Sequence, residues 1–108
     1  MSKYVLISSR DPFEHGDALS FYETCGGLKD AGADVTLMLV QNGVLPSRES
    51  RYSVEIASLC QKGVKVLADR YALETRGIKE ADLIQGVSSG DLDLVIDHMA
   101  EGSKVIWH

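Results

Sequence analysis

The sequence predicts one α/β domain over residues 1–108, with a three-layer α/β/α arrangement, a mostly parallel sheet of about five strands and a flavodoxin-like layout. Short apolar runs without alternation are typical of strands buried on both faces of a sheet. They alternate with segments of helical periodicity, and the connections are short, which favours parallel pairing. A chain of 108 residues also leaves too little sequence for a second core.

In the first half of the chain the pattern is strand, helix, strand, helix. Residues 4–8 (YVLIS) form the first buried run, and residues 17–30 then carry apolar side chains at helical spacing until Gly32. Residues 35–40 form a second apolar run, which Asn42-Gly43 closes as a turn, and residues 52–62 repeat the helical pattern. Two β-α units are therefore expected here.

A third unit follows at residues 64–68 (VKVLA), which predict a strand. Asp69 comes directly after it, where an aspartate is among the commonest N-caps, and a short helix is expected over residues 70–76. Gly77 supplies its end.

The last part of the chain predicts a weaker strand at residues 84–88, an amphipathic helix at residues 91–100 and a final strand at residues 104–107. That final strand is expected at an edge of the sheet. Trp107 belongs either to the core or to an exposed assembly surface, and we favour the core, because aromatic residues this scarce are usually needed inside a small domain. The apolar face of the last helix consists of Leu92, Val95, Ile96 and Met99.

Composition excludes several classes of function. A formal net charge of −5, with scattered Lys and Arg, argues against direct contact with nucleic acid. The longest apolar run, residues 35–40, is far below the roughly 20 residues of a membrane helix, and the chain start leads into a strand rather than a signal peptide. We therefore expect a cytoplasmic protein without a membrane partner, and no sequence motif indicates a cofactor.

Candidate ligand-binding residues come from the loops after the first three strands. In an open parallel sheet these loops converge on the carboxyl edge, so we expect Ser9, Arg10, His15, Asn42 and Asp69 to form the functional edge. For Asp69 a structural role as helix cap is favoured over a ligand contact. No glycine-rich phosphate loop is present, and a surface role is favoured for His15, which has no nucleophile in sequence reach.

Cysteine and histidine spacing indicates neither a metal site nor a disulfide framework, so no metal ligand is assigned. Cys25 and Cys60 both fall on apolar helical stripes. Buried thiols there behave as small hydrophobic groups and have raised pKa values. Of the two, Cys25 is the candidate catalytic residue, because Gly26 and Gly27 beside it thin the packing.

Four segments resemble the DsrE/DsrF/DsrH family of sulfur-relay proteins, which includes TusB-like and TusD-like subunits. They are Asp11-Pro12-Phe13-Glu14, the turn from Leu39 to Val44, the stretch from Val64 to Ile78 with its Arg76-Gly77 pair, and the closing Lys104-Val105-Ile106-Trp107. The resemblance rests on their order and spacing, which extend over nearly the whole chain.

The resemblance implies a role for one position in particular. In DsrE-like and TusD-like members the corresponding strand is followed by a cysteine that carries persulfide sulfur, and counting back from Arg76-Gly77 puts Asp69 there. DsrH-like members have an acidic residue in this stretch, and some carry a cysteine in the first helix, where this chain has Phe21 and, one turn later, Cys25. A persulfide carrier needs an accessible thiolate, which Asp69 cannot supply.

Three functions follow in order of preference. The first is a subunit or regulator of a sulfur-relay or sulfur-oxidation assembly that does not itself carry persulfide. The resemblance implies a homo-oligomer and DsrE-like or TusA-like protein partners for it. The second is a domain that binds a small anion or nucleotide at the carboxyl edge. The third is a sulfurtransferase that uses Cys25.

Overall fold

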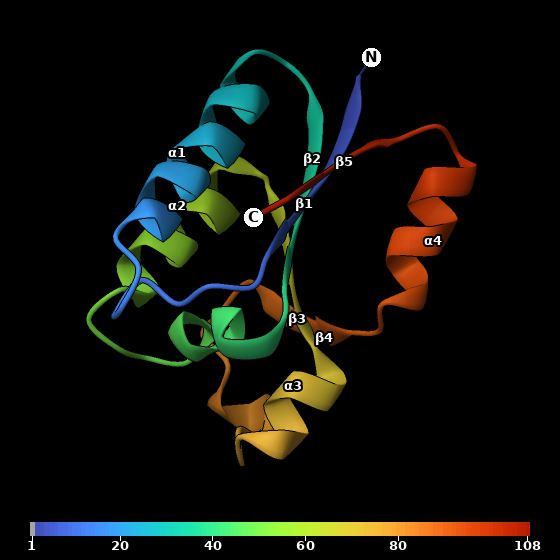
Figure 1. Ribbon diagram of the computed structural model, residues 1–108. Coiled ribbons are helices and arrows are strands. Elements are labelled where there is room, and N and C mark those ends of the chain that lie inside the picture. The colour runs from blue at the N-terminus through green and yellow to red at the C-terminus, as the bar shows by residue number, and fades with distance from the viewer. Residues whose placement is uncertain (1) are drawn as a thin grey trace.

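Five parallel strands form the centre of the computed structural model, which describes residues 2–108 (Figure 1). Their order across the sheet is β4-β3-β2-β1-β5, so β5 lies at an edge beside β1. The strands are β1 (Lys3–Ser8), β2 (Asp34–Leu39), β3 (Lys65–Asp69), β4 (Val87–Gly90) and β5 (Lys104–Trp107). The predicted three-layer α/β/α fold is confirmed.

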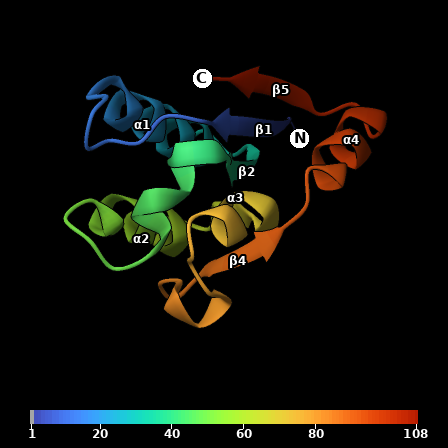
Figure 2. The same ribbon diagram turned by 60° about the horizontal axis from the view of Figure 1, so that its bottom comes forward.

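The order of the strands determines which helices cover which face. The chain advances in one direction from β1 to β4, and right-handed crossovers then put α1 (Asp17–Asp30) and α2 (Ser53–Lys62) on the same face. The return from β4 to β5 runs the other way and carries α4 (Asp93–Ala100) across the opposite face (Figures 1 and 2). A short helix, α3 (Arg70–Thr75), lies at the carboxyl ends of the strands. Within the described residues no helix is long and apolar enough to cross a membrane.

The sheet separates two hydrophobic cores of unequal size. The larger one lies between the sheet and the helices α1 and α2, and it contains Leu6 and Leu37, which are fully buried and paired in register. The smaller one lies under α4 and consists of Val5, Ile7, Met38, Val40, Leu67 and Val95. Because β1, β2 and β3 are buried on both faces, their sequences lack the alternation of a half-exposed strand.

Two predicted segments differ from the structure. The fourth strand is Val87–Gly90 rather than residues 84–88, because the Ile84 backbone N–H donates to the Ser47 carbonyl (2.8 Å) and Gly86 then turns the chain with φ +98°. The loop after β2 contains a 3-10 helix, η1 (Gln41–Ser47). A second short 3-10 helix, η2, covers Glu80–Asp82.

The first turn of η1 packs tightly against the end of β1. Gln41 has a positive φ of 51°, and Gly43 faces the Ser8 carbonyl, with which any Cβ at this position would collide. The Val40 backbone N–H donates to the same Ser8 carbonyl at 2.9 Å. A residue without a side chain is therefore required where the sequence has the Asn-Gly turn.

The apolar side chains of α4 and β5 do not fill the core as the sequence pattern predicts. On α4 only Val95 is buried, whereas Ile96 and Met99, and Leu92 just before the helix, are exposed. The placement of Trp107 in the core was wrong, since 61% of this residue is exposed. The physical reason is that a helix of eight residues crossing one face of the sheet turns only a narrow strip toward it.

Candidate functional site

Asp69 ends β3 and caps α3. Its carboxylate accepts a hydrogen bond from the Ala72 backbone N–H at 3.1 Å, and its own backbone is extended (φ −60°, ψ 123°). The residue is 9% exposed. This is the N-cap geometry favoured from the sequence, and it places one carboxylate at the start of a helix on the carboxyl edge of the sheet.

Asn42 connects η1 to α3 through an arginine that the sequence analysis did not select. The Arg76 guanidinium donates from Nε (3.1 Å) and Nη2 (2.9 Å) to Asn42 Oδ1, and from Nη1 to the Ala72 carbonyl (3.1 Å). The signal in the sequence was the Arg76-Gly77 pair, which we considered only as part of a family pattern. Since protein acceptors engage these donors, Arg76 joins two elements of the edge.

A cleft of about 420 Å³ opens beside these residues. It brings together the carboxyl ends of β2, β3 and β5 with α3 and the start of the segment leading to α4. Its lining comprises Val40, Gln41, Asp69, Tyr71, Ala72, Thr75, Arg76, Leu92 and Trp107. The aromatic side chains of Tyr71 and Trp107 are exposed, so the cleft offers flat apolar walls and one carboxylate but no thiol.

Ser9 and Arg10 lie at a different part of the same edge, around the carboxyl end of β5. The Ser9 backbone N–H and hydroxyl both donate to the His108 carbonyl (2.9 and 3.0 Å). Asp17 Oδ2 lies 3.1 Å from His108 Nε2 and 3.7 Å from Arg10 Nη1. The His108 ring stacks on Phe21, with 4.9 Å between ring centroids. These contacts fasten β5 to the start of α1.

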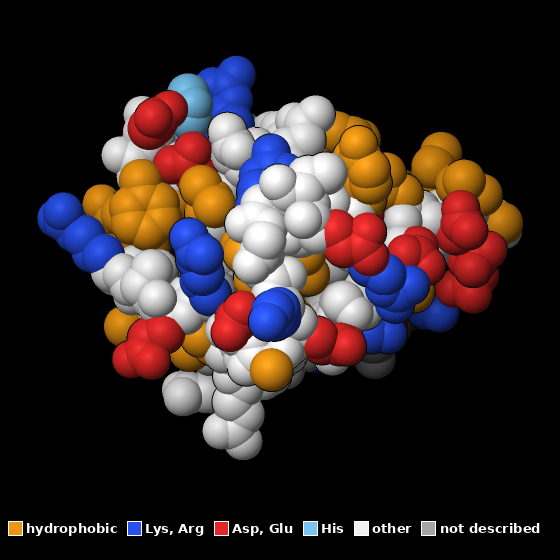
Figure 3. All heavy atoms as spheres, turned by 90° about the horizontal axis from the view of Figure 1, so that it is seen from below, with side chains coloured by type: hydrophobic (Ala, Val, Ile, Leu, Met, Phe, Trp, Pro, Cys, Tyr) orange, Lys and Arg blue, Asp and Glu red, His pale blue; other side chains and the backbone are white. Residues whose placement is uncertain are grey.

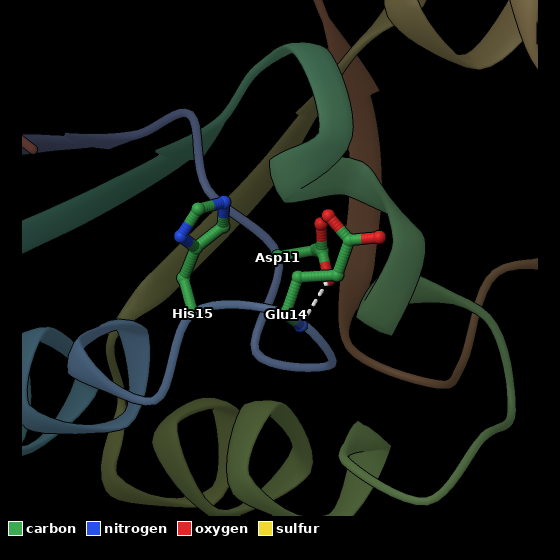
Figure 4. A group of neighbouring side chains, drawn as sticks. All are labelled: Asp11, Glu14 and His15. Atoms are coloured by element: carbon green, nitrogen blue, oxygen red, sulfur yellow. Dashed lines mark hydrogen bonds between the residues drawn. The ribbon is translucent and has the colours of Figure 1, made fainter.

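His15 belongs to a third group, together with Asp11 and Glu14 (Figure 4). One potential ligand atom from each side chain lies within 4.8 Å of the others, and Asp11 Oδ1 accepts the Glu14 backbone N–H at 2.9 Å. Asp11 is buried and Glu14 is exposed. Two carboxylates and an imidazole are ligand types that zinc and similar ions accept, so this group could hold a divalent ion on three ligands. The sequence predicts no metal ligand, and that expectation stays a prediction, because a group of three potential ligands does not by itself make a metal site.

The five predicted edge residues thus share one end of the sheet but divide among three groups. Asn42 and Asp69 lie near the cleft, Ser9 and Arg10 near the end of β5, and His15 in the loop after β1. Seen from below, this end of the molecule carries charged side chains of both signs, and hydrophobic side chains show on the α4 side and on the opposite side (Figure 3).

Neither cysteine lies at this edge. Cys25 is fully buried on the inner face of α1, and burial raises the pKa of its thiol to about 12. Cys60, which we expected to be buried, is partly exposed on α2 because it borders the surface groove next to Gly86. Burial also raises the pKa of Cys60. At neutral pH both thiols are therefore protonated, and neither is an activated nucleophile.

Comparisons with known proteins agree on family and fold. The model of the DsrE/DsrF-like family matches residues 2–108. No curated protein sequence matches the chain. Among solved structures, the YchN protein from E. coli superposes with a TM-score of 0.89 at 20% sequence identity. MTH1491 from Methanobacterium thermoautotrophicum, described as a protein of unknown function, superposes with a TM-score of 0.87 at 21% identity. Each covers 100% of both chains.

A third solved structure, BT1422 from Bacteroides thetaiotaomicron, is described as a conserved protein of unknown function. It superposes with a TM-score of 0.82 at 16% identity, over 99% of this chain and 95% of its own. At these identities the structural likeness establishes the shared fold, whereas the chemistry has to be argued from the residues present.

Proposed function

The chain belongs to the DsrE/DsrF-like family, and on that premise we propose that it is a subunit or regulator of a cytoplasmic sulfur-relay or sulfur-oxidation assembly that does not itself carry persulfide. The observation that supports this most directly is Asp69. It stands where the family resemblance expects the sulfur-carrying cysteine, and its carboxylate caps α3.

The chemistry of that position supports a role without sulfur transfer. A helix N-terminus stabilises an anion, which is a thiolate in a cysteine-bearing relative and the carboxylate of Asp69 here. The carboxylate keeps the helix cap, but it can neither attack a sulfane sulfur nor hold one. Cys25 does not replace it, because the Cys25 side chain is fully buried on the inner face of α1.

The assembly part of the proposal rests on exposed apolar side chains on and beside α4. The exposed side chains are Ile96 and Met99 on the helix, Leu92 at its N-cap, and Ile106 and Trp107 on the edge strand. Edge strands and apolar patches of this kind are commonly covered by another subunit. We propose a second copy of this chain as the occupant and a DsrE-like or TusA-like protein as the further partner.

The test separates assembly from sulfur transfer. Purified protein is examined by sedimentation at micromolar concentration, where we expect an oligomer that Ile96→Glu dissociates; a monomeric wild type contradicts the homo-oligomer. Association is then measured against purified cysteine-bearing DsrE-like and TusA-like proteins. After treatment of each with a persulfide donor, mass spectrometry should find added sulfur on the partner and none on this chain. Sulfur on Cys25 that is lost in Cys25→Ser would instead favour the sulfurtransferase alternative.

A second candidate function is the binding of a small anion or nucleotide, for which the exposed aromatic walls of the cleft beside Asp69 supply a surface on which a base can stack. Trp107 is the single tryptophan of the chain, and it lines this cleft, so its fluorescence reports on occupancy. Titration with adenosine monophosphate and with inorganic phosphate separates stacking on the aromatic walls from binding of the anion alone. A saturable change in emission with either probe would raise this candidate above the first.

A further inference from the structure

The strand β5 forms one edge of the sheet, and among residues 2–108 no other element lies along its outer side (Figure 2). An edge strand exposes a row of unpaired N–H and C=O groups, which proteins usually cover or flank with charge. The opposite edge strand, β4, ends in two serines and a glycine. In β5, by contrast, Ile106 is 39% exposed and Trp107 is 61% exposed. The uncovered apolar edge of the sheet is therefore β5.

The hydrogen bonds to β1 determine which backbone groups of β5 point outward. The His108 N–H donates to the Ile7 carbonyl at 2.8 Å, and the His108 carbonyl accepts the Ser9 N–H at 2.9 Å. Both backbone groups of His108 thus face β1. Because alternate residues of a parallel strand bond to the same neighbour, Val105 and Trp107 direct their N–H and C=O groups away from β1. Two free donors and two free acceptors therefore lie along the outer edge.

The register with β1 also determines the face on which each side chain of β5 lies. Val105 and Trp107 are opposite two members of the smaller core, so they lie on the face that α4 covers. Lys104 and Ile106 lie on the other face, against which α1 and α2 pack. The His108 ring is on this second face as well, where it stacks on a phenylalanine of α1. A strand added at the edge has to match its side chains to both faces.

We propose that β5 of a second copy occupies this edge, antiparallel to the first across a two-fold axis, with Ile106 opposite its counterpart. In this register the outward groups of Val105 meet those of Trp107 in the other copy, which gives four hydrogen bonds. The two Ile106 side chains cover each other, and each Val105 covers a Trp107. A shift that puts Val105 opposite itself would leave Trp107 opposite Ser103, outside the strand. This contact rests on the homo-oligomer proposed above and specifies which strands meet in it.

The ends of the paired strands carry complementary charges. In this register Lys104 of one copy lies opposite His108 of the other, on the face that α1 covers. His108 Nε2 is 3.1 Å from Asp17 Oδ2, and the Asp17 side chain is 54% exposed. The Lys104 ammonium group can therefore reach an exposed carboxylate of the second copy, and the two-fold axis repeats this contact. A second β5 thus fits the edge in hydrogen bonding, apolar cover and charge.

The second copy also contributes to the cleft beside Asp69. Trp107 forms part of the lining of that cleft, and in the pair Val105 of the neighbour packs against it. Because the two-fold axis is perpendicular to the sheet, both clefts and both α4 helices lie on the same face of the joined sheet. Each cleft therefore receives one of its walls from the other copy.

The first experiment is disulfide cross-linking in a Cys60→Ser background, which removes the partly exposed native thiol. Ile106→Cys places a thiol on the two-fold axis, where opposite Cα atoms are about 4.5 Å apart, so oxidation should convert most of the protein into covalent dimers on a non-reducing gel. Lys104→Cys is the matched control on the same face of the same strand. Its counterpart in the other copy lies about 13 Å away along the strand, so it should form no covalent dimer.

The second experiment reverses charges and measures self-association by sedimentation. Lys104→Glu should weaken self-association about tenfold, because it faces Asp17 of the other copy and each pair contains this contact twice. Asp17→Lys added to the same chain should restore the affinity. If the double variant associates no better than Lys104→Glu alone, the two residues do not meet and the pairing is wrong.

The outcomes separate this pairing from the proposed homo-oligomer. A wild type that sediments as an oligomer, with an Ile106→Cys variant that does not cross-link, overturns the strand pairing and leaves the homo-oligomer in place; a monomeric wild type overturns both. Equal cross-linking of Lys104→Cys indicates random collision and overturns the pairing. A mixed dimer of the Ile106→Cys and Lys104→Cys proteins would show the shifted register and also overturns it. If Ile106→Cys does not fold, as judged by circular dichroism, the charge reversal decides.

Discussion

Replacing Asp69 with alanine tests whether this residue has the structural role that its geometry indicates. The substitution removes the acceptor for the Ala72 N–H, and Ala72 is only 2% exposed, so water cannot fully replace the lost bond. Loss of an N-cap costs about 0.5–2 kcal/mol, and an unsatisfied buried donor belongs to the upper part of that range. We therefore expect a loss of ~1.5 kcal/mol in the free energy of unfolding. For a domain of this size that corresponds to a fall in Tm of about 6 °C.

The assay is denaturant unfolding of matched variants. Asp69→Asn should lose only a few tenths of a kcal/mol, because asparagine caps a helix about as well as aspartate. Asp91→Ala is the surface control. It breaks an ion pair with Arg70 in which both side chains are more than half exposed, and such pairs contribute about 0–1 kcal/mol. The reasoning is refuted if Asp69→Ala costs no more than Asp91→Ala, or if Asp69→Asn is as destabilising as Asp69→Ala.

Three further predictions concern other parts of the molecule. Gly27→Ala should stabilise the fold by about 0.5–1 kcal/mol in thermal unfolding, whereas Gly43→Ala should cost ~2 kcal/mol or more, because its Cβ would collide with a backbone carbonyl. Burial raises the pKa of the Cys25 thiol from 9.0 to about 12. The neutral thiol therefore makes its full contribution to the free energy of unfolding below pH 9, and this contribution is lost as the pH rises toward 12. Cys25→Ala should make the free energy of unfolding, measured over this pH range, fall less steeply. Arg76→Lys and Asn42→Ala should each lower the free energy of unfolding by about 1 kcal/mol, because each removes the hydrogen bonds between these two side chains. In a double-mutant cycle the double variant should lose little more than either single variant, since both changes remove the same interaction.

The fold could be predicted from the sequence because its signals are local and strong. The run that forms β2 is apolar over residues 35–40 and needs cover on both faces, and this alone favours a parallel sheet between helices. Asp69 was recognised as a cap for a similar reason, since a cap depends only on its position before a helix. The fourth strand was misplaced because the turn at Gly86 and the backbone hydrogen bond from Ile84 to Ser47 delay its start. A hydrogen bond between residues this far apart in the sequence leaves no local sequence pattern.

The candidate site was less accessible because it is assembled from distant segments. Arg76 reaches Asn42 across 34 positions, and the cleft beside Asp69 depends on how the carboxyl ends of the strands pack with α3. Trp107 was placed in the core on the grounds of scarcity, but the strip of sheet under α4 is narrow and leaves it outside. Side-chain type told us which residues are suited to a core, and only the packing decides which ones have room there.

The pairing of β1 with β5 has a consequence for how the chain folds during synthesis. Tyr4 lies opposite Lys104 and Ile7 opposite Trp107, so β1 acquires one of its two neighbours only after the other four strands of the sheet have been synthesised. The smaller core includes Val95 and is supported by Val105, so it too is completed only once α4 and β5 have been synthesised. Contacts this far apart in sequence raise the contact order and slow folding. Until then one edge of β1 is unpaired, and a nascent chain is open to pairing with a neighbouring one at this strand.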